Sequence, residues 1–292
     1  MYLAIISDSH NSRSFFLSIP RSSHIIKIIT IITIIKSINH QRMLGSNSQD
    51  DPLTRALHVG DLPTVRQLIS DRPSSLLEYL PAHPELRLTP LHLACHHGYD
   101  SIASFLITQR ADVNAVNYCC DSPLHWAARE GRADIVERLL EQPECRLDAC
   151  NVESCTALHW ASAAGSNASV KALVARKANV NVVDGAGRTP LHYASKAGVR
   201  SVVQCLIVAL ADINAVTTRS RDTPLHVAIE YRRLDVVKCL LEFGARKDVV
   251  DRHGHSPIDR ASVSDAELAA LLRDYGTCDS HTLFRSISST RP

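Results

Sequence analysis

The sequence predicts an all-α protein, a solenoid in which helix-turn-helix units are stacked one on the next. A tetrapeptide of the form Thr/Ser-Pro-Leu-His recurs six times, with successive spacings of 33, 34, 33, 34 and 33 residues. In most units a glycine ends the first helical pattern, and a second run of apolar residues at helical period follows it. A fixed period of this length is typical of repeat proteins, whose units bury their apolar faces against one another.

The recurring tetrapeptides mark where the first helix of each unit begins. Thr or Ser at the N-cap accepts a hydrogen bond from an unpaired backbone amide, and proline at the first helical position has no amide to leave unpaired. An alanine five residues after each Thr or Ser lets two helices approach closely. The copies are Thr89-Pro90-Leu91-His92, Ser122-Pro123-Leu124-His125, Thr156-Ala157-Leu158-His159, Thr189-Pro190-Leu191-His192, Thr223-Pro224-Leu225-His226 and the degenerate Ser256-Pro257-Ile258-Asp259.

Glycines predict where most of these first helices end. Gly98, Gly131, Gly165 and Gly198 stand nine residues after the start, and glycine tolerates the left-handed conformation that ends a short helix. Arg232 takes this place in the sixth unit, where the left-handed conformation costs a non-glycine residue on the order of 1 kcal/mol. After the second helix, a polar segment is predicted to project as a turn between units.

Helix, turn, helix and projecting hairpin at this period, opening with Thr-Pro-Leu-His, resemble the ankyrin repeat. The resemblance covers roughly Asp51 to Gly276 and rests on several positions that repeat in phase. It implies an ankyrin-repeat α-solenoid with β-hairpin-like projecting loops, in which hairpins and first helices line the concave side. We count about seven units, near 51–88, 89–121, 122–155, 156–188, 189–222, 223–255 and 256–276.

The first and last units depart from the pattern, as expected of the caps that an open stack requires. The first unit lacks Thr-Pro and is recognised by alignment on Gly60, and the stretch from Ser70 to Leu88 is expected to be an enlarged loop. The last unit lacks the glycine. Residues 277–292 are expected to form a disordered tail.

Residues 1–42 have a different composition, with an isoleucine-rich run from Ile25 to Lys36 among Ser, Arg and His. No membrane span is predicted, because no apolar run reaches the roughly 18 residues that a spanning helix needs. The segment is basic, Ser-rich and poor in acidic residues, which fits an organellar targeting peptide. Alternatively, translation begins at Met43 and the preceding residues are an extension without function. Residues 43–50 are expected to be a linker.

The charge distribution argues against nucleic acid as a partner. Residues 1–50 hold five Lys/Arg against two Asp/Glu, which leaves 27 basic and 28 acidic residues in the remainder. A body without net charge lacks the basic field on which non-specific nucleic-acid binding depends. The nine cysteines include Cys95, Cys205 and Cys239 on apolar helix faces, and this usage suits a reducing compartment. A cytoplasmic or nuclear location is therefore expected.

No catalytic, cofactor or metal site is predicted. One histidine recurs in every central unit, whereas a catalytic residue would occur once, and the resemblance implies that this imidazole joins the backbone of neighbouring repeats. These histidines are His92, His125, His159, His192 and His226. Trp126, Trp160 and Tyr193, at the next position, are expected to pack along the first helices. The cysteines lack the Cys-x-x-Cys spacing of a strong zinc site, so we predict a protein that is not an enzyme.

Binding is expected at positions that vary between units, because packing fixes the core positions. Variation is concentrated in the two residues before each first-helix glycine and in the hairpin tips, which the resemblance places on the concave surface. The candidate partner-binding residues are His96, His97, Tyr118, Asp121, Arg129, Glu130, Glu153, Arg188, Lys196, Arg219, Arg221, Asp222, Glu230, Tyr231, Arg252 and His255. The expected anchors are Tyr118, Arg188, Arg219, Arg221 and Tyr231. Their mixed charges predict a partner that is neither strongly acidic nor strongly basic.

The predicted function is protein binding, as a scaffold, adaptor or stoichiometric regulator that is monomeric on its own. Two alternatives remain open: a proteasome-associated chaperone-like ankyrin protein, and a substrate-recognition subunit of a ubiquitin ligase or other enzyme complex.

Asn114, Asn181 and Asn214 occupy a position that a dioxygenase hydroxylates in many ankyrin proteins. The alternative, which we favour, is a structural asparagine that closes the turn.

Overall fold

The computed structural model describes residues 51–71, 86–264 and 266–274. Contacts divide the chain into two units, Met1–Ser48 and Gln49–Pro292, and all described residues belong to the second. The isoleucine-rich segment, the linker at 43–50 and the tail at 277–292 lie outside the described residues, as does most of the expected enlarged loop.

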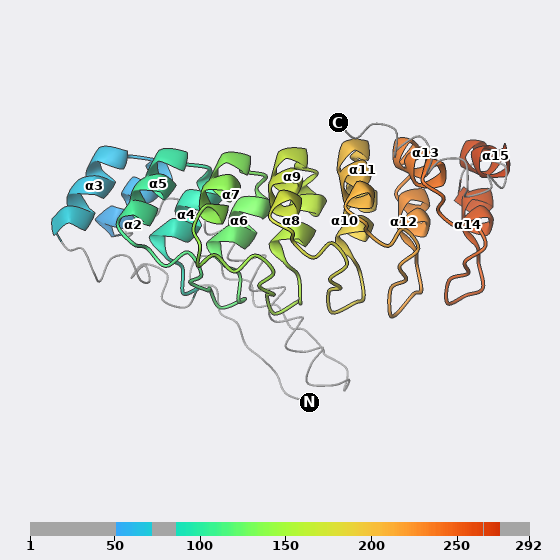
Figure 1. Cartoon of the computed structure of the whole chain (residues 1–292), viewed down its shortest axis with the longest axis horizontal. Helices are drawn as coiled ribbons and strands as arrows, with labels where there is room; N and C mark the ends of the chain where they lie inside the picture. The colour runs from blue at the N-terminus through green and yellow to red at the C-terminus, as the bar shows by residue number, and fades with distance from the viewer. Residues whose placement is uncertain (1–50, 72–85, 265, 275–292) are drawn as a thin grey trace, which may run out of the picture. The chain divides into compact units, whose positions relative to one another are not determined.

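The described residues form fourteen helices that pair in chain order, one pair in each expected unit, and Figure 1 shows the pairs in one row. The first helices are α2 (Pro52–Val59), α4 (Pro90–His97), α6 (Pro123–Arg129), α8 (Ala157–Ala164), α10 (Pro190–Ala197), α12 (Pro224–Glu230) and α14 (Pro257–Ser264). The second helices are α3 (Leu62–Asp71), α5 (Asp100–Thr108), α7 (Ala133–Leu140), α9 (Asn167–Ala175), α11 (Arg200–Val208), α13 (Leu234–Glu242) and α15 (Ala266–Asp274). None of these helices is long and apolar enough to cross a membrane, and none of the described residues is in a strand. The predicted all-α class is confirmed.

The helices form two layers whose apolar faces meet. First helices pack on first helices from α2 to α14, and second helices pack on second helices from α3 to α13. The alanines that follow each helix start are fully buried where neighbouring first helices approach: Ala94, Ala127, Ala161, Ala194, Ala228 and Ala261. Because every pair lies between two others or at an end of the row, each unit buries its apolar face largely against its neighbours.

The predicted N-caps start the first helices, and the first unit has one that the sequence analysis missed. Thr89, Ser122, Thr156, Thr189 and Thr223 cap α4, α6, α8, α10 and α12. In α2 the carboxylate of Asp51 accepts hydrogen bonds from the backbone N–H groups of Leu53 (2.9 Å) and Thr54 (3.0 Å). A carboxylate caps a helix as well as a hydroxyl does, so Asp51-Pro52 replaces the missing Thr-Pro.

The glycines nine residues after each helix start end first helices in the left-handed conformation, as predicted. They also make room for the next unit. Gly98 has φ 82° and Gly198 has φ 86°. A Cβ atom on Gly98 would lie 2.7 Å from Nε of Arg132, and one on Gly198 would lie 2.6 Å from Cδ of Arg233. The side chain that begins each second helix therefore lies against the glycine of the preceding unit.

Arg232 adopts the left-handed conformation predicted for it, with φ 52°. We expect Arg232→Gly to raise the free energy of unfolding by up to about 1 kcal/mol, because glycine populates this region without the Cβ penalty. Urea denaturation of the purified protein would measure this change. Arg219→Gly is the control, since Arg219 does not have positive φ. A lower free energy of unfolding for Arg232→Gly would contradict the prediction.

The segments between units are hairpin-like loops that are linked to one another by backbone hydrogen bonds. In one of them the Asp184 N–H donates to the Arg188 carbonyl (2.9 Å), which closes the loop. The neighbouring loop is joined to it through the Thr218 N–H and the Ala186 carbonyl (3.0 Å). That neighbour closes between Thr217 and Asp222 (3.0 Å), so it spans six residues where the loop from 184 to 188 spans five. The added residue lies in the segment that contains Arg219 and Arg221.

The five recurring histidines join each unit to the next, as the resemblance implied. In His125, Nδ1 accepts from the Ser122 N–H (3.1 Å) and Nε2 donates to the Cys155 carbonyl of the following hairpin (3.1 Å). Because a backbone N–H can only donate, Nδ1 is unprotonated and Nε2 carries the proton. The same bridge runs from His92, His159, His192 and His226 to the carbonyls of Asp121, Arg188, Asp222 and His255.

The seventh unit has an aspartate where the other units have this histidine. The carboxylate of Asp259 accepts from the N–H (2.8 Å) and the hydroxyl (2.6 Å) of Ser256, so it reproduces the local half of the bridge. A carboxylate has no proton to donate to the carbonyl of a following hairpin. The substitution therefore retains the helix start of α14 without requiring a further unit.

Candidate partner-binding surface

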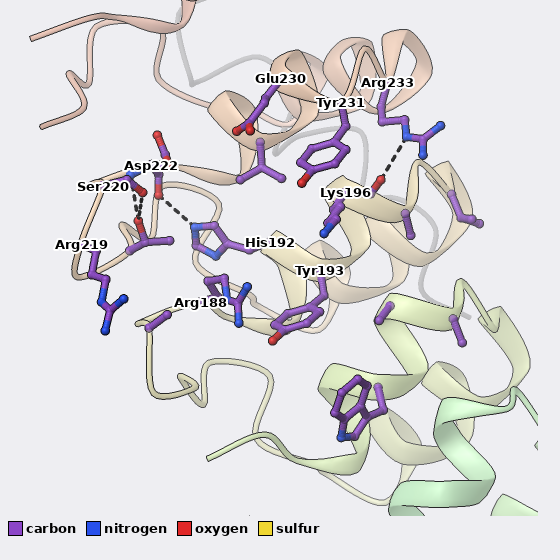
Figure 2. Close-up of a pocket in the computed structure, with 18 residues that line it drawn as sticks. Arg188, His192, Tyr193, Lys196, Arg219, Ser220, Asp222, Glu230, Tyr231 and Arg233 are labelled. Carbon is purple, nitrogen blue, oxygen red and sulfur yellow. Dashed lines mark hydrogen bonds between the residues drawn. The ribbon is translucent and has the colours of Figure 1, made fainter. Parts of the chain in front are cut away.

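First helices and hairpins of three successive units enclose a groove with a volume of about 830 Å³ (Figure 2). Its residues come mainly from α8, α10 and α12 and from the hairpins that precede α10 and α12. We call this surface the groove. The lining residues are Trp160, Ala163, Ala164, Ala186, Arg188, His192, Tyr193, Lys196, Ala197, Val199, Thr217, Arg219, Ser220, Asp222, Val227, Glu230, Tyr231 and Arg233.

The structure brings six of the predicted binding residues together in the groove. They are Arg188, Lys196, Arg219, Asp222, Glu230 and Tyr231. The expected anchors Tyr118 and Arg221 are exposed hairpin residues that do not line it, and Tyr118 has 66% of its surface exposed. The other predicted residues outside the groove are His96, His97, Asp121, Arg129, Glu130, Glu153, Arg252 and His255.

Aromatic rings on successive first helices are each covered by a cation. The guanidinium of Arg129 lies 5.5 Å from the ring centroid of Trp160, and that of Arg188 lies 4.9 Å from the centroid of Tyr193. The ammonium group of Lys196 is 4.9 Å from the centroid of Tyr231. Such cation–π contacts hold long cationic side chains against the rings. The groove therefore combines flat apolar surfaces with positive charge.

Asp184 fixes the position of Arg188 and Tyr193 from beneath the groove. Its carboxylate accepts from the Arg188 N–H (2.8 Å), the Arg188 Nε (2.7 Å) and the Tyr193 hydroxyl (2.8 Å), and the residue is 5% exposed. Burial alone would raise the pKa of Asp184, but these hydrogen bonds lower it below its usual value. Asp184 is thus a buried, ionised support for two residues of the groove.

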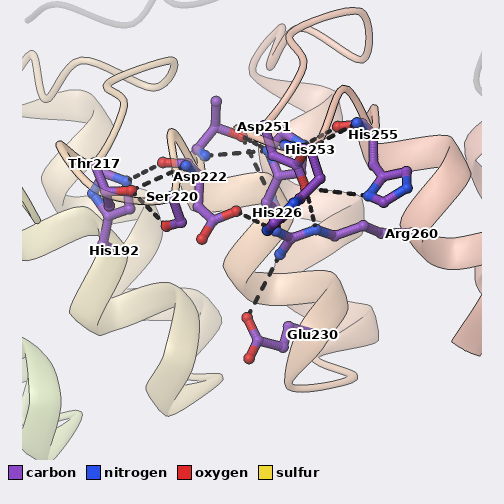
Figure 3. Close-up of polar contacts among 11 residues, drawn as sticks. His192, Thr217, Ser220, Asp222, His226, Glu230, Asp251, His253, His255 and Arg260 are labelled. Atoms are coloured by element: carbon purple, nitrogen blue, oxygen red, sulfur yellow. Dashed lines mark hydrogen bonds and ion pairs between the residues drawn. The ribbon is translucent and has the colours of Figure 1, made fainter.

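Arg260 of α14 gathers the carboxylates at the end of the groove (Figure 3). Its guanidinium nitrogens lie 2.7 Å from Oδ1 of Asp222, 2.8 Å from Oδ2 of Asp251 and 3.7 Å from Oε2 of Glu230. Asp222 is 9% exposed. Asp222 was predicted to contact a partner, but its carboxylate is buried against Arg260, so we do not retain it as a direct contact.

Two further predicted contact residues, His96 and Asp121, are also buried inside the protein. His96 is 8% exposed, and its Nδ1 lies 3.3 Å from the carboxylate of Glu130. Asp121 is 6% exposed and accepts a hydrogen bond from the Asn151 side chain (2.7 Å). Both positions vary between units in the sequence, but both side chains are buried in the stack.

His97 is half-buried and lies beside His58 of the preceding unit. Its Nε2 lies 3.1 Å from Nδ1 of His58, and burial followed by the charges of His96 and His58 lowers the pKa of His97 to about 4. His97 is therefore neutral at pH 7.

Among the described residues no group of three or more His, Cys, Asp or Glu side chains is arranged to hold a metal ion.

The three asparagines of the second-helix turns connect neighbouring units. The side-chain amide of Asn114 donates to the Glu144 carbonyl (2.8 Å), and its oxygen accepts from the Arg146 N–H (2.8 Å). Asn181 makes the same pair of bonds to the Leu210 carbonyl and the Asp212 N–H, and Asn214 accepts from the Arg246 N–H. These asparagines have a structural role, but they bridge units instead of closing their own turns.

Three residues line the groove that were not predicted as partner contacts from the sequence: Trp160, Tyr193 and Arg233. Trp160 and Tyr193 were expected to pack along the helices, and both are partly exposed into the groove. Arg233 is the N-cap of α13, a position that varies between units as strongly as the hairpins do. Its counterparts are Tyr99, Arg132, Ser166 and Val199. That variation was a signal in the sequence that could have identified Arg233.

Comparisons with known proteins agree with this architecture. The chain is 32% identical over 241 residues to the nuclear factor NF-kappa-B p105 subunit of Gallus gallus, a match that covers 78% of this chain and 21% of that protein. A probable E3 ubiquitin-protein ligase, XBOS33, of Oryza sativa subsp. japonica is 33% identical over 45% of this chain and 25% of its own length. This chain therefore spans about a quarter or less of these relatives.

A solved structure and a family model also match this chain. The crystal structure of the ankyrin repeat domain of Bcl-3, described as a member of the IkappaB protein family, superimposes with a TM-score of 0.63 and 29% identity, covering 78% of this chain and all of that domain. The model for ankyrin repeats in three copies matches residues 53–149, 124–217 and 198–282. These matches cover most of the chain, so this protein belongs to the ankyrin-repeat family.

Proposed function

We propose that this protein binds another protein stoichiometrically through the groove, as a scaffold, adaptor or regulator. The observation that carries the proposal is a groove of about 830 Å³ in which Trp160, Tyr193 and Tyr231 lie beside arginine and lysine side chains. Tyr, Trp and Arg are the residue types that most often dominate the energetics of protein interfaces. The expected anchors that line the groove are Arg188, Arg219 and Tyr231.

The proposal is tested by affinity purification with the full chain from cells of its source. The groove variant combines Arg219→Ala with Tyr231→Ala, since both side chains are exposed and their loss leaves the core intact. The control variant combines Lys177→Ala with Val208→Ala, two exposed residues outside the groove. Truncating one hot-spot residue costs about 2 kcal/mol, which weakens binding by about 30-fold.

We expect the wild type and the control variant to retain a common partner that the groove variant loses. A partner that all three proteins retain equally would exclude the groove as its binding site. Circular dichroism and thermal melting of the three proteins would show whether the folded state is unchanged, so that loss of a partner reflects the surface.

We also propose that the protein is a monomer before it binds and that it works in the cytoplasm or nucleus. All eight cysteines among the described residues are free thiols, which suits a reducing compartment. Fluorescence microscopy of the tagged full chain and light scattering of the purified protein would test location and mass. The match to an E3 ubiquitin-protein ligase keeps the substrate-recognition alternative open, while nothing in the described residues favours the proteasome-associated one.

A further inference from the structure

The two carboxylates that line the groove, Asp222 and Glu230, share one guanidinium, that of Arg260. Asp184 binds Arg188, with Oδ2 2.7 Å from Nε. Asp222 binds Arg260 at 2.7 Å, and Glu230 lies 3.7 Å from the same guanidinium. Four cationic side chains line the groove against these two carboxylates, so its lining carries a net positive charge. The cations are Arg188, Lys196, Arg219 and Arg233.

Three cations of the groove have no such partner. Lys196, Arg219 and Arg233 are exposed, and none lies within ion-pair distance of a carboxylate in the described part of the chain. They come from α10, from a hairpin and from the start of α13. Figure 2 shows Arg219 at the hairpin side and Arg233 at the helix side, with Lys196 between them. These cationic side chains therefore reach from the hairpin side of the groove to its helix side.

We propose that the groove binds an extended, acidic peptide segment of the partner, which presents both carboxylates and apolar side chains on the face that meets the groove. This inference rests on the proposed function of the groove. The carboxylates meet Lys196, Arg219 and Arg233, while the apolar side chains pack on the rings of Tyr193 and Tyr231. Both rings line the groove, and 40% of the surface of Tyr231 is exposed.

The dimensions of the groove fit an extended segment. Adjacent packed helices lie about 8–10 Å apart, so the distance from α8 to α12 is on the order of 20 Å. An extended chain advances about 3.3 Å per residue, so roughly six residues cross the groove. A peptide of that length presents about three side chains to one face.

The probe for this inference is a phage-displayed library of random nonapeptides, selected on the full chain. Wild-type protein is expected to enrich peptides rich in Asp and Glu. The charge-reversal variant Lys196→Glu/Arg219→Glu is expected to lose these peptides and to enrich Lys and Arg instead. The matched control is Lys171→Glu/Lys177→Glu, which changes net charge equally at exposed residues outside the groove. It should select the same peptides as the wild type.

Fluorescence polarisation of the best labelled peptide gives the magnitude. Charge reversal in the groove should weaken its binding about tenfold or more, and the control should change it by about twofold at most. Replacing the peptide's carboxylates by amides should weaken binding to the wild type. Binding should also fall as NaCl is raised, because salt screens exposed charges.

The outcomes separate this inference from the proposed function. Selected peptides that are neutral or basic, yet lost by the groove variant, would overturn the acidic segment and leave the groove as a binding site. Selected peptides that bind the wild type and the groove variant equally would overturn both. A nine-nucleotide oligouridylate that binds more tightly than the peptides would show a general polyanion site and would also overturn the inference.

Discussion

Replacing His125 by alanine is expected to lower the free energy of unfolding by about 3 kcal/mol, because each buried polar group left unpaired costs about 1–3 kcal/mol. The imidazole is 1% exposed and joins the Ser122 N–H to the Cys155 carbonyl. Alanine leaves the Ser122 N–H unpaired and opens a cavity between two units, while the Cys155 carbonyl keeps its hydrogen bond from the Asn151 N–H (3.0 Å). Urea denaturation followed by circular dichroism would measure the loss.

His253→Ala is the control for this change. His253 is an exposed hairpin residue, so its replacement should alter the free energy of unfolding by no more than about 0.5 kcal/mol. Hydrogen exchange should show lower protection on both sides of the substituted bridge, in α6 and in the hairpin that contains Cys155, since neighbour interfaces dominate the stability of repeat proteins. Equal losses for the two variants would show that the bridge contributes nothing.

Lowering the pH from 7 to 4.5 is expected to remove about 5 kcal/mol of stability, from two histidines alone. Burial lowers the pKa of His92 and of His192 to about 4, from 6.5 in the unfolded chain. Between these values the unfolded state binds more protons than the folded state, so protonation favours unfolding. The contribution of these two histidines to the free energy of unfolding is fully present above pH 6.5 and is lost as the pH falls towards 4. Protonation of Nδ1 would also remove the acceptor for the N-cap amide.

A series of urea denaturations between pH 7.5 and 4.5 would test this dependence. His192→Asn should be less stable at pH 7, and its free energy of unfolding should fall less steeply with acidification, by about 1.4 kcal/mol per pH unit. Val208→Asn, at an exposed residue that does not titrate, should keep the wild-type slope. Parallel curves for wild type and His192→Asn would contradict the assignment of this dependence to the bridging histidines.

Features of the fold that depend on local sequence were predictable. The N-caps, the glycine ends and the helical period repeat in every central unit, and each acts within a few residues of itself. The cap at Asp51 was not predicted, because the first unit lacks the Thr-Pro that marks the other helix starts, although a carboxylate caps a helix as well as a hydroxyl does. The second role of Gly98 and Gly198, as space for Arg132 and Arg233, could not be predicted because it joins neighbouring units.

The sequence predicted several residues of the candidate site, but it did not predict which of its charged residues form ion pairs. Variation between units pointed to Arg188, Arg219 and Tyr231, which line the groove. It pointed equally to Asp121 and His96, which are buried. A position that varies in sequence can face a partner or the next unit, and only packing decides between the two.

The sequence by itself determined the helix pairs, their order and the bridging histidines, because capping, helical period and the need of each unit to cover an apolar face are written into every repeat. Only the tertiary structure decided where the groove lies and which of its charges remain free. Arg260 of the last helix pair meets Asp222, Glu230 and Asp251 across a unit boundary, whereas Lys196, Arg219 and Arg233 lie within ion-pair distance of no carboxylate in the described part of the chain. Ion pairing depends on distances of a few ångströms between residues far apart in the chain, and no repeat pattern specifies those distances.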